Sequence, residues 1–312
     1  MPSANEALNK AKDAKKDEFY TQITDIEKEM IYYKEHFKDK IVLCNCDDPV
    51  WSAFWGYFHV NFAELCLKKL ISTHYEKEKE TYKMEYTGGN DKDIEDGIKI
   101  PLEGNGDFRS KECLDVLDES DIVVTNPPFS LFRPFVTVLM EHKKKFLILG
   151  NMNAITYKEI FPLIKYNKLW YGASIHSGDR KFYVPDDYPL NASGCGIEDN
   201  GRRFIQVKGV RWFTNLDYKA RHENLVLRKN YTTEEYQKYD DFDVINVDKY
   251  SEIPCDYDGI MGVPITFLDY YNPDQFEIIW LDGTDISKWY GIGPYLNGKK
   301  KYHRIFIRKR VG

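Results

Sequence analysis

Four short apolar segments, separated by helix-like stretches, constrain the fold of this chain more than any other feature. They are expected to form strands at residues 40–46, 70–75, 121–125 and 146–150. Helical stretches are expected between them at residues 51–69 and 131–142. Strands separated by helices of this length are typical of a doubly wound, mostly parallel α/β sheet. Such a sheet binds its ligands at the carboxyl edge of the strands.

The flanking segments follow a less regular pattern. Thr24 and Glu27 form a capping box, which predicts that a helix starts there. Residues 76–100 are charged and contain Gly and Asp, which predicts a solvated loop or hairpin. Further strands are expected at residues 169–171, 204–207 and 210–216. The helix-poor remainder predicts a domain boundary near residue 216, with a smaller subdomain over residues 217–312.

Composition excludes several classes of protein. The chain has 44 Lys and Arg against 50 Asp and Glu, a net charge of −6, so any DNA contact must come from a local basic patch. It has no apolar run of about 18 residues and no apolar leader, so we expect no membrane association. Its six cysteines form no C-x-x-C pair, which favours reduced thiols in the cytoplasm. Aromatic residues reach 15%, which fits either a tyrosine-rich core or stacking on bases.

The sharpest local signal is Asn126-Pro127-Pro128-Phe129, which follows the apolar segment 121–125. Two consecutive prolines fix two φ angles and remove two backbone donors, so this segment is a rigid rim. The Asn126 side-chain oxygen and the Pro127 carbonyl are suited to hold both hydrogens of an exocyclic amino group, and Phe129 is suited to stack on the ring. These four residues are the catalytic candidates. The alternative is a Pro-Pro turn with a capping Asn.

The strand followed by Asn-Pro-Pro-Phe resembles the catalytic motif of S-adenosylmethionine-dependent amino-methyltransferases. The rest of the chain resembles the EcoRI-type adenine-specific DNA methyltransferases. Collinear segments carry this resemblance, at residues 17–22, 44–49, 106–110, 120–130, 153–158, 214–217 and 261–268. The resemblance implies a Rossmann-like class I methyltransferase fold. It also implies a catalytic domain over residues 1–216 and a smaller C-terminal target-recognition region, in contact with DNA, over residues 217–312.

The resemblance further implies a cofactor site for S-adenosylmethionine. Its residues lie in three motifs, namely Phe19, Tyr20 and Thr21, then Asn45, Cys46, Asp47 and Asp48, and finally Asp107 and Phe108. Carboxylates suit the sulfonium and ammonium groups of this cofactor. The second motif stands where most methyltransferases have a glycine-rich loop. No metal is expected; a zinc site formed by the two cysteines and two aspartates of this motif is the alternative. The residue that binds the ribose hydroxyls is left open, because the strand expected at 70–75 ends without a carboxylate.

Four further residues are candidates for binding the substrate. Trp212 and Phe213 lie where related enzymes place an aromatic ring that stacks on the flipped base, although a buried strand aromatic is the alternative. Residues 299–310 carry the densest positive charge. As a strand, this segment would present Arg304 and Arg308 on one face, which suits phosphate contact. A solvated terminal strand is the alternative.

The predicted function is site-specific methylation of the exocyclic amino nitrogen of a flipped-out adenine in duplex DNA, in or derived from a restriction-modification system. Double-stranded DNA is the expected partner, together with a cognate restriction endonuclease that acts on the same site. The enzyme is expected to be a cytoplasmic monomer. Alternatives are methylation of an RNA adenine, of a cytosine amino group or of a protein glutamine. A catalytically silent DNA-binding protein on the same scaffold is a further alternative.

Overall fold

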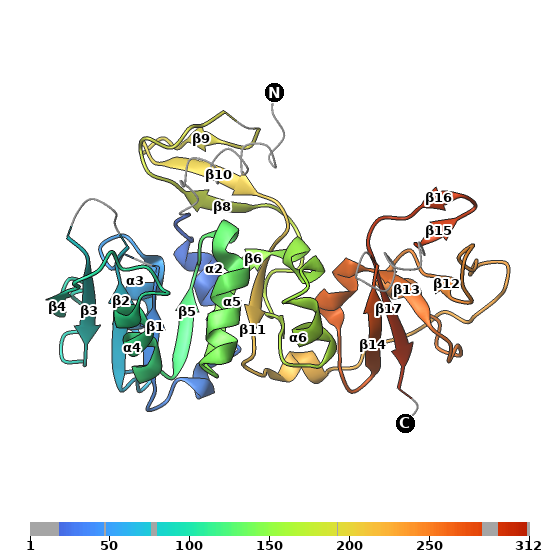
Figure 1. The fold of residues 1–312 in the computed structure, drawn as a ribbon, viewed down its shortest axis with the longest axis horizontal. Coiled ribbons are helices and arrows are strands. Elements are labelled where there is room, and N and C mark those ends of the chain that lie inside the picture. Colours follow the sequence, from blue (N-terminus) through green and yellow to red (C-terminus); the bar gives the residue numbers. More distant parts are fainter. Residues whose placement is uncertain (1–18, 47, 76–79, 192, 283–292, 311–312) are drawn as a thin grey trace. The chain divides into compact units, whose positions relative to one another are not determined.

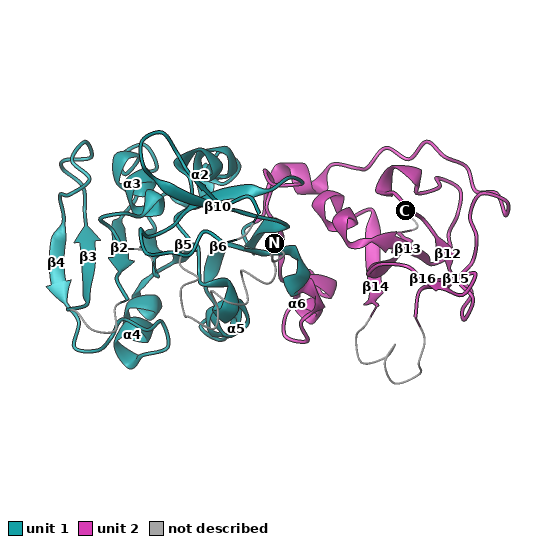
Figure 2. Cartoon of the chain, turned by 90° about the horizontal axis from the view of Figure 1, so that it is seen from above, with its two compact units in different colours: residues 1–154, 177–216 teal, residues 155–176, 217–312 magenta. Residues whose placement is uncertain are grey.

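The computed structural model describes residues 19–46, 48–75, 80–191, 193–282 and 293–310. The chain divides into two compact units (Figure 2). Unit 1 comprises residues 1–154 and 177–216, and unit 2 comprises residues 155–176 and 217–312. The segment 155–176 therefore belongs to unit 2 with the C-terminal residues, whereas the sequence analysis included it in the predicted domain of residues 1–216. Its helix α6 (Phe161–Lys165) packs against strand β14 (Phe276–Leu281) of unit 2.

Unit 1 is built on a mixed sheet with the strand order β4-β3-β2-β1-β5-β6-β11 (Figure 1). These strands are β1 (Ile41–Cys44), β2 (Lys69–Thr73), β3 (Tyr82–Tyr86), β4 (Ile98–Pro101), β5 (Ile122–Thr125), β6 (Lys145–Asn151) and β11 (Val210–Thr214). The four central strands β2, β1, β5 and β6 are parallel, whereas β3, β4 and β11 pair antiparallel to their neighbours. The predicted α/β fold with a large central sheet is confirmed.

Helices cover both faces of this sheet. They are α2 (Ile23–Met30), α3 (Ala53–Val60), α4 (Lys111–Glu119) and α5 (Phe132–Glu141). Figure 2 shows α2 and α3 on one side of the sheet and α4 and α5 on the other. Ser52 caps α3 and Ser110 caps α4, each by accepting hydrogen bonds from backbone N–H groups of the first turn. The capping box predicted at Thr24 is not formed, because the N-cap of α2 is Gln22, two residues earlier, and its side chain makes no capping hydrogen bond.

The charged segment after β2 contributes strands to the sheet, as β3 and β4 extend it antiparallel from β2. Tyr82 and Tyr86 are 7% and 3% exposed. Between them, Glu85 bridges Lys69 and Lys83 at 2.7 and 2.6 Å. The high charge of this segment therefore concealed a half-buried strand, in which tyrosines pack inward and ion pairs form among the other side chains.

The strand order reverses at β1, which has β2 on one side and β5 on the other. This is the topological switch point at which open α/β sheets bind ligands. A second, small sheet of unit 1 has the order β8-β10-β9. Its strands are β8 (Arg180–Tyr183), β9 (Gly196–Ile197) and β10 (Arg203–Val207).

Unit 2 contains a sheet with the order β12-β13-β17-β14. Besides β14, its strands are β12 (Ile245–Asn246), β13 (Met261–Pro264) and β17 (Arg304–Lys309). β17 lies between β13 and β14, and Ile305, Phe306 and Ile307 are all at most 1% exposed. The alternative of a solvated terminal strand is therefore wrong for residues 304–307, which are all buried. Within the described ranges, no helix is long and apolar enough to cross a membrane.

Candidate active site at the carboxyl edge of unit 1

Hydrogen bonds bring three distant motifs together where β1 and β5 end. The Thr125 hydroxyl donates to the backbone carbonyl of Asn45, which joins the ends of the two strands. The Asn126 side-chain Nδ2 donates to the Phe19 carbonyl at 2.7 Å. The backbone of Tyr20 pairs with Tyr183 of β8 through two hydrogen bonds of 2.9 and 3.0 Å. The first predicted motif therefore lies against the catalytic candidate Asn126.

Three buried polar atoms in these motifs have no hydrogen-bond partner among the described residues. They are Thr21 Oγ1, Asn45 Oδ1 and Asn126 Oδ1. Their residues are 6%, 3% and 8% exposed. An unsatisfied buried donor or acceptor costs about 1–3 kcal/mol, so such atoms are rare unless a ligand pairs with them. This edge of the sheet therefore offers unused acceptors to a molecule that carries N–H or O–H groups.

Aromatic rings surround the Asn126 motif. Phe129 meets Phe19 edge-to-face at 5.7 Å and Phe182 at 6.3 Å between ring centroids. Phe19 also contacts Tyr188 at 6.2 Å. Phe129 is half-buried, whereas the other three rings are buried. Sequence reasoning missed Phe182 and Tyr188, because the small sheet that positions them lies more than fifty residues beyond the motif.

The loop after β1 departs from glycine-rich loops in sequence, but one of its residues has a backbone conformation that glycine favours. Cys46 has φ = 64°, in the left-handed region that glycine favours. Asp47 lies outside the described residues. Asp48 accepts hydrogen bonds from the Tyr82 hydroxyl and the Val50 N–H, both at 2.9 Å, and its Oδ2 lies 3.3 Å from His74 Nδ1. Burial, followed by this contact with Asp48, raises the pKa of Tyr82.

The third predicted motif lies next to the residues that follow β2. Gly106 has φ = 74°, and a Cβ atom there would lie 2.2 Å from the His74 carbonyl oxygen. Asp107 accepts from Arg109 Nε at 2.9 Å and from Nη2 at 2.6 Å, and these bonds lower the pKa of Asp107. Phe108 is 4% exposed and packs against Phe135 of α5 at 5.0 Å. Asp107 is therefore placed to accept further hydrogen bonds beside Arg109, whereas Phe108 contributes chiefly to the core.

Trp212 and Phe213 lie inside unit 1 and away from its surface. They are 1% and 0% exposed. Trp212 packs edge-to-face against Phe54 at 6.0 Å, and Phe213 packs against Phe132 at 4.8 Å. A ring with no exposed area cannot stack on an incoming base without opening the core. The structure therefore assigns both rings to packing and corrects the expectation of base stacking.

Arg304 and Arg308 also differ from their predicted role as phosphate-binding cations. The Arg304 side chain is 7% exposed and forms an ion pair with Asp248 at 3.0 Å. Arg308 is half-exposed, and its Nε donates to Glu277 Oε1 at 2.5 Å. Both guanidinium groups already pair with a carboxylate within unit 2. The sequence showed these positive charges but gave no indication of the acids that pair with them.

A mixed α/β sheet with Asn-Pro-Pro-Phe at its switch point is consistent with a methyltransferase fold. Comparison with known proteins gives the family. Residues 7–310 match the family described as "Adenine-specific methyltransferase EcoRI". The type II methyltransferase M.EcoRI of Escherichia coli is 47% identical and covers 99% of this chain and 98% of its own length. No solved structure matches the chain.

Two mycoplasma proteins are similar over nearly the same length. They are M.MpnI of Mycoplasma pneumoniae, at 41% identity, and M.MgeORF184P of Mycoplasma genitalium, at 40%. Each covers 97% of this chain and 98% of its own length, and each is named a type II methyltransferase. The chain therefore belongs to the EcoRI family of adenine-specific methyltransferases. It is a DNA adenine methyltransferase of the restriction-modification type, a family whose usual methyl donor is S-adenosylmethionine.

Proposed function

We propose that this enzyme extrudes an adenine from duplex DNA and transfers a methyl group from S-adenosylmethionine to its exocyclic amino nitrogen. The observation that carries this proposal is the arrangement of Asn126. Its Nδ2 is held by the Phe19 carbonyl at 2.7 Å, while its Oδ1 is buried without a partner among the described residues. A fixed amide with one unused acceptor is suited to receive an N–H donor and to do so in a single orientation.

The chemistry follows from the weak nucleophilicity of an adenine amino group, whose lone pair is delocalised into the ring. Asn126 Oδ1 would accept one amino hydrogen and the Pro127 carbonyl the other, which draws the nitrogen towards a tetrahedral geometry. Phe129 would stack on the base, because its ring is half-buried and held edge-on by Phe19 and Phe182. These contacts position and desolvate the nitrogen, and they require no strong base.

The residues at this edge fit S-adenosylmethionine, which supplies an electrophilic methyl group when bound. Asn45 Oδ1 and Thr21 Oγ1 are buried polar atoms without a partner in the described part of the chain, as expected where a ligand supplies donors. Asp107, kept ionised by Arg109, suits an amino or hydroxyl donor. We assign Phe19, Tyr20, Thr21, Asn45, Cys46, Asp47, Asp48, Asp107 and Phe108 to the cofactor site, with Phe108 supporting it from the core. No metal is needed in this scheme.

Extrusion of a base from the stack costs a few kcal/mol, which the contacts of the aromatic site help to offset. Recognition of the surrounding sequence needs a further surface, and we propose that unit 2 provides it. The enzyme would act as a monomer alongside a restriction endonuclease that cleaves the same site. Unit 1 would then perform the transfer, and unit 2 would select where it occurs.

Sequencing with modified-base detection, on DNA from cells that express the protein, tests this proposal. We expect N6-methyladenine at one short sequence, and none in cells that express the Asn126→Ala variant. Methylated cytosine amino groups, or methylated RNA with unmodified DNA, would contradict the proposal. Calorimetry with S-adenosylmethionine on the purified protein provides a readout of cofactor binding that does not depend on activity.

A further inference from the structure

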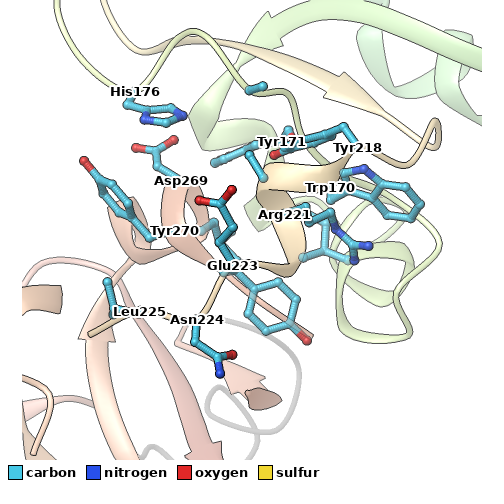
Figure 3. Close-up of a pocket in the computed structure, with 15 residues that line it drawn as sticks. Trp170, Tyr171, His176, Tyr218, Arg221, Glu223, Asn224, Leu225, Asp269 and Tyr270 are labelled. Carbon is cyan, nitrogen blue, oxygen red and sulfur yellow. The ribbon is translucent and has the colours of Figure 1, made fainter. Parts of the chain in front are cut away.

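Unit 2 contains a cavity of about 280 Å³ that lies outside all the predicted motifs. Five aromatic side chains line it, namely Trp170, Tyr171, Tyr218, Tyr270 and Tyr271. Figure 3 shows Trp170 and Arg221 at one end, with His176, Asp269 and Tyr270 at the other. The volume and the aromatic lining suit a flat heterocyclic ring.

Contacts within unit 2 hold these walls in place. Tyr270 stacks on Tyr250 at 3.9 Å with 22° between the ring planes, and His176 meets it edge-to-face at 5.4 Å. The Tyr218 hydroxyl donates to the Tyr171 carbonyl at 3.1 Å. Because these rings are already oriented, a stacked ligand would lose little affinity to ordering them.

The charges of the cavity favour a ligand that donates hydrogen bonds. Glu223 and Asp269 both line it, and Asp269 is 8% exposed. Glu223 has no ion-pair or side-chain hydrogen-bond partner among the described residues. In Figure 3 its carboxylate points towards the end of the cavity where Asp269 and Tyr270 lie. These two carboxylates would repel a phosphate or any other anion, but they would accept from an amino group.

The one cation of the lining is fixed on the opposite wall. Arg221 lies over the Trp170 ring at 3.9 Å and pairs with Asp217 at 3.3 Å. Arg221 is 6% exposed, and its Nε has no acceptor in the part of the chain that the structure describes. This buried N–H is suited to donate to a ring nitrogen or carbonyl, the groups that accompany an amino group on cytosine and adenine.

Unpaired cations lie beside the lining residues in the sequence. Lys168 precedes Trp170 by two positions, and Lys219 begins the short helix η4 (Lys219–His222) that carries Arg221. Both lysines are exposed, and neither has a carboxylate within 4.0 Å among the described residues. Free lysines outside an acidic, aromatic cavity match a nucleotide whose base enters and whose phosphates remain outside.

We propose that this cavity binds an unstacked nucleobase with an exocyclic amino group, a second base besides the target adenine. The inference rests on the proposed function, since it makes DNA the ligand of unit 2. Stacking on tyrosines would provide affinity for any base, and Glu223 with Asp269 would select amino-bearing bases over thymine or uracil. The cavity would thus contribute to the choice of sequence, while Asn126 handles the reacting base.

Binding of single-stranded oligonucleotides tests this directly. The Asn126→Ala background removes the amino acceptor of unit 1. In it, fluorescence anisotropy at fixed salt compares oligodeoxycytidine with oligodeoxyuridine of about twelve nucleotides. We expect at least a roughly fivefold preference for cytosine, because a base-edge contact discriminates by about 1–3 kcal/mol. Glu223→Ala should reduce the preference below about twofold, and Tyr270→Leu should weaken both oligonucleotides. Glu235→Ala, an exposed carboxylate that faces Lys229 at 4.0 Å, is the matched control.

Equal binding of the two oligonucleotides, or a preference that survives Glu223→Ala, would overturn the inference. Competition by spermidine without any preference between bases would do so too, and would assign the cavity to a small cation. Glu223→Ala in the otherwise unchanged enzyme is then assayed for methylation of duplex DNA. If adenine in duplex DNA is methylated by the unchanged enzyme, but the Asn126→Ala protein with Glu223 intact shows no oligonucleotide preference, the cavity proposal fails and the proposed function stands.

Discussion

The edge of the sheet in unit 1 and strand β17 in unit 2 were both predicted to contact ligands, and they differ in one property. At the edge, the polar atoms Thr21 Oγ1, Asn45 Oδ1 and Asn126 Oδ1 are buried without partners in the described residues. On β17, Arg304 and Arg308 already pair with Asp248 and Glu277. A ligand can complete the edge, whereas it would have to displace existing partners on β17.

The difference separates two sequence signals, a run of basic residues and a polar residue that ends a buried strand. A run of basic residues shows where positive charge is dense, but carboxylates elsewhere in the chain decide whether that charge can bind a ligand. A polar residue that ends a buried strand is different, because the strand fixes its position and burial limits its choice of partners. Unused buried acceptors therefore indicate a binding site better than local charge density does.

The largest effect is expected at Asn126. Asn126→Ala should slow methyl transfer by at least about a hundredfold, as for other positioned groups that act on the transition state. Asn126→Asp keeps the acceptors but loses the Nδ2 donor to Phe19, so it should be similarly slow. Tritium transfer gives the rate, and calorimetry should show unchanged cofactor affinity. A rate within tenfold of the unchanged enzyme would contradict the mechanism.

Stability should separate the two arginines of β17. Arg304→Gln should lower the free energy of unfolding by about 2–3 kcal/mol, because it removes a buried guanidinium group that pairs with Asp248. The loss should be smaller than for a fully buried ion pair, because the half-exposed Asp248 carboxylate can be hydrated in the variant. Arg308→Gln should cost less than about 1 kcal/mol, because its pair is exposed. Urea denaturation of both variants measures this difference. Equal losses would show that burial does not distinguish the two pairs.

The salt dependence of duplex binding compares paired with unpaired cations. Each phosphate contact contributes a slope of roughly −0.9 in log affinity against log salt. The double variant Lys168→Gln with Lys219→Gln should flatten the slope by about one to two units. The double variant Arg304→Gln with Arg308→Gln should leave it nearly unchanged, contrary to what the charge density of residues 299–310 suggests. If the arginine double variant flattened the slope more than the lysine double variant, β17 would be part of the DNA-binding surface.

The smallest effect concerns His222, whose hydrogen bonds to Asp274 and Asp217 raise its pKa above 6.5. Because the pKa is higher in the folded state, the stabilisation is complete below pH 6.5 and disappears as pH rises through the folded value. His222 is partly exposed, so the contribution should stay below about 1 kcal/mol. Urea midpoints across this range should fall with pH, and His222→Gln should remove that dependence. An unchanged profile would exclude the ion pairs as its cause.

The strands and the catalytic motif could be predicted because their signals are local. The strands β1, β2, β5 and β6 lie in or within a residue of the predicted segments, since each is an apolar run buried by helices on both faces. Asn126 follows β5, as expected. Tyr183 could not be predicted as the partner of Tyr20, because their pairing depends on a separate sheet.

Pairing of charges had no local signal either. Asp248 lies 56 positions from Arg304, and its ion pair forms only once β17 inserts between β13 and β14. The same reason explains the charged segment after β2, which was expected to be a solvated loop or hairpin. Its tyrosines become buried only when β3 and β4 join the sheet.

The contacts of Phe19 and Tyr20 have a consequence for the order in which the enzyme becomes competent during synthesis. Phe19 contacts a residue 107 positions later, and Tyr20 is fixed by Tyr183. More than half of the chain therefore has to be synthesised before the segment that holds the Asn126 amide is anchored. A nascent or truncated chain that ends between residues 130 and 182 carries the complete Asn-Pro-Pro-Phe motif but lacks Tyr183, which anchors the first motif. Only chains translated past the small sheet would therefore methylate DNA.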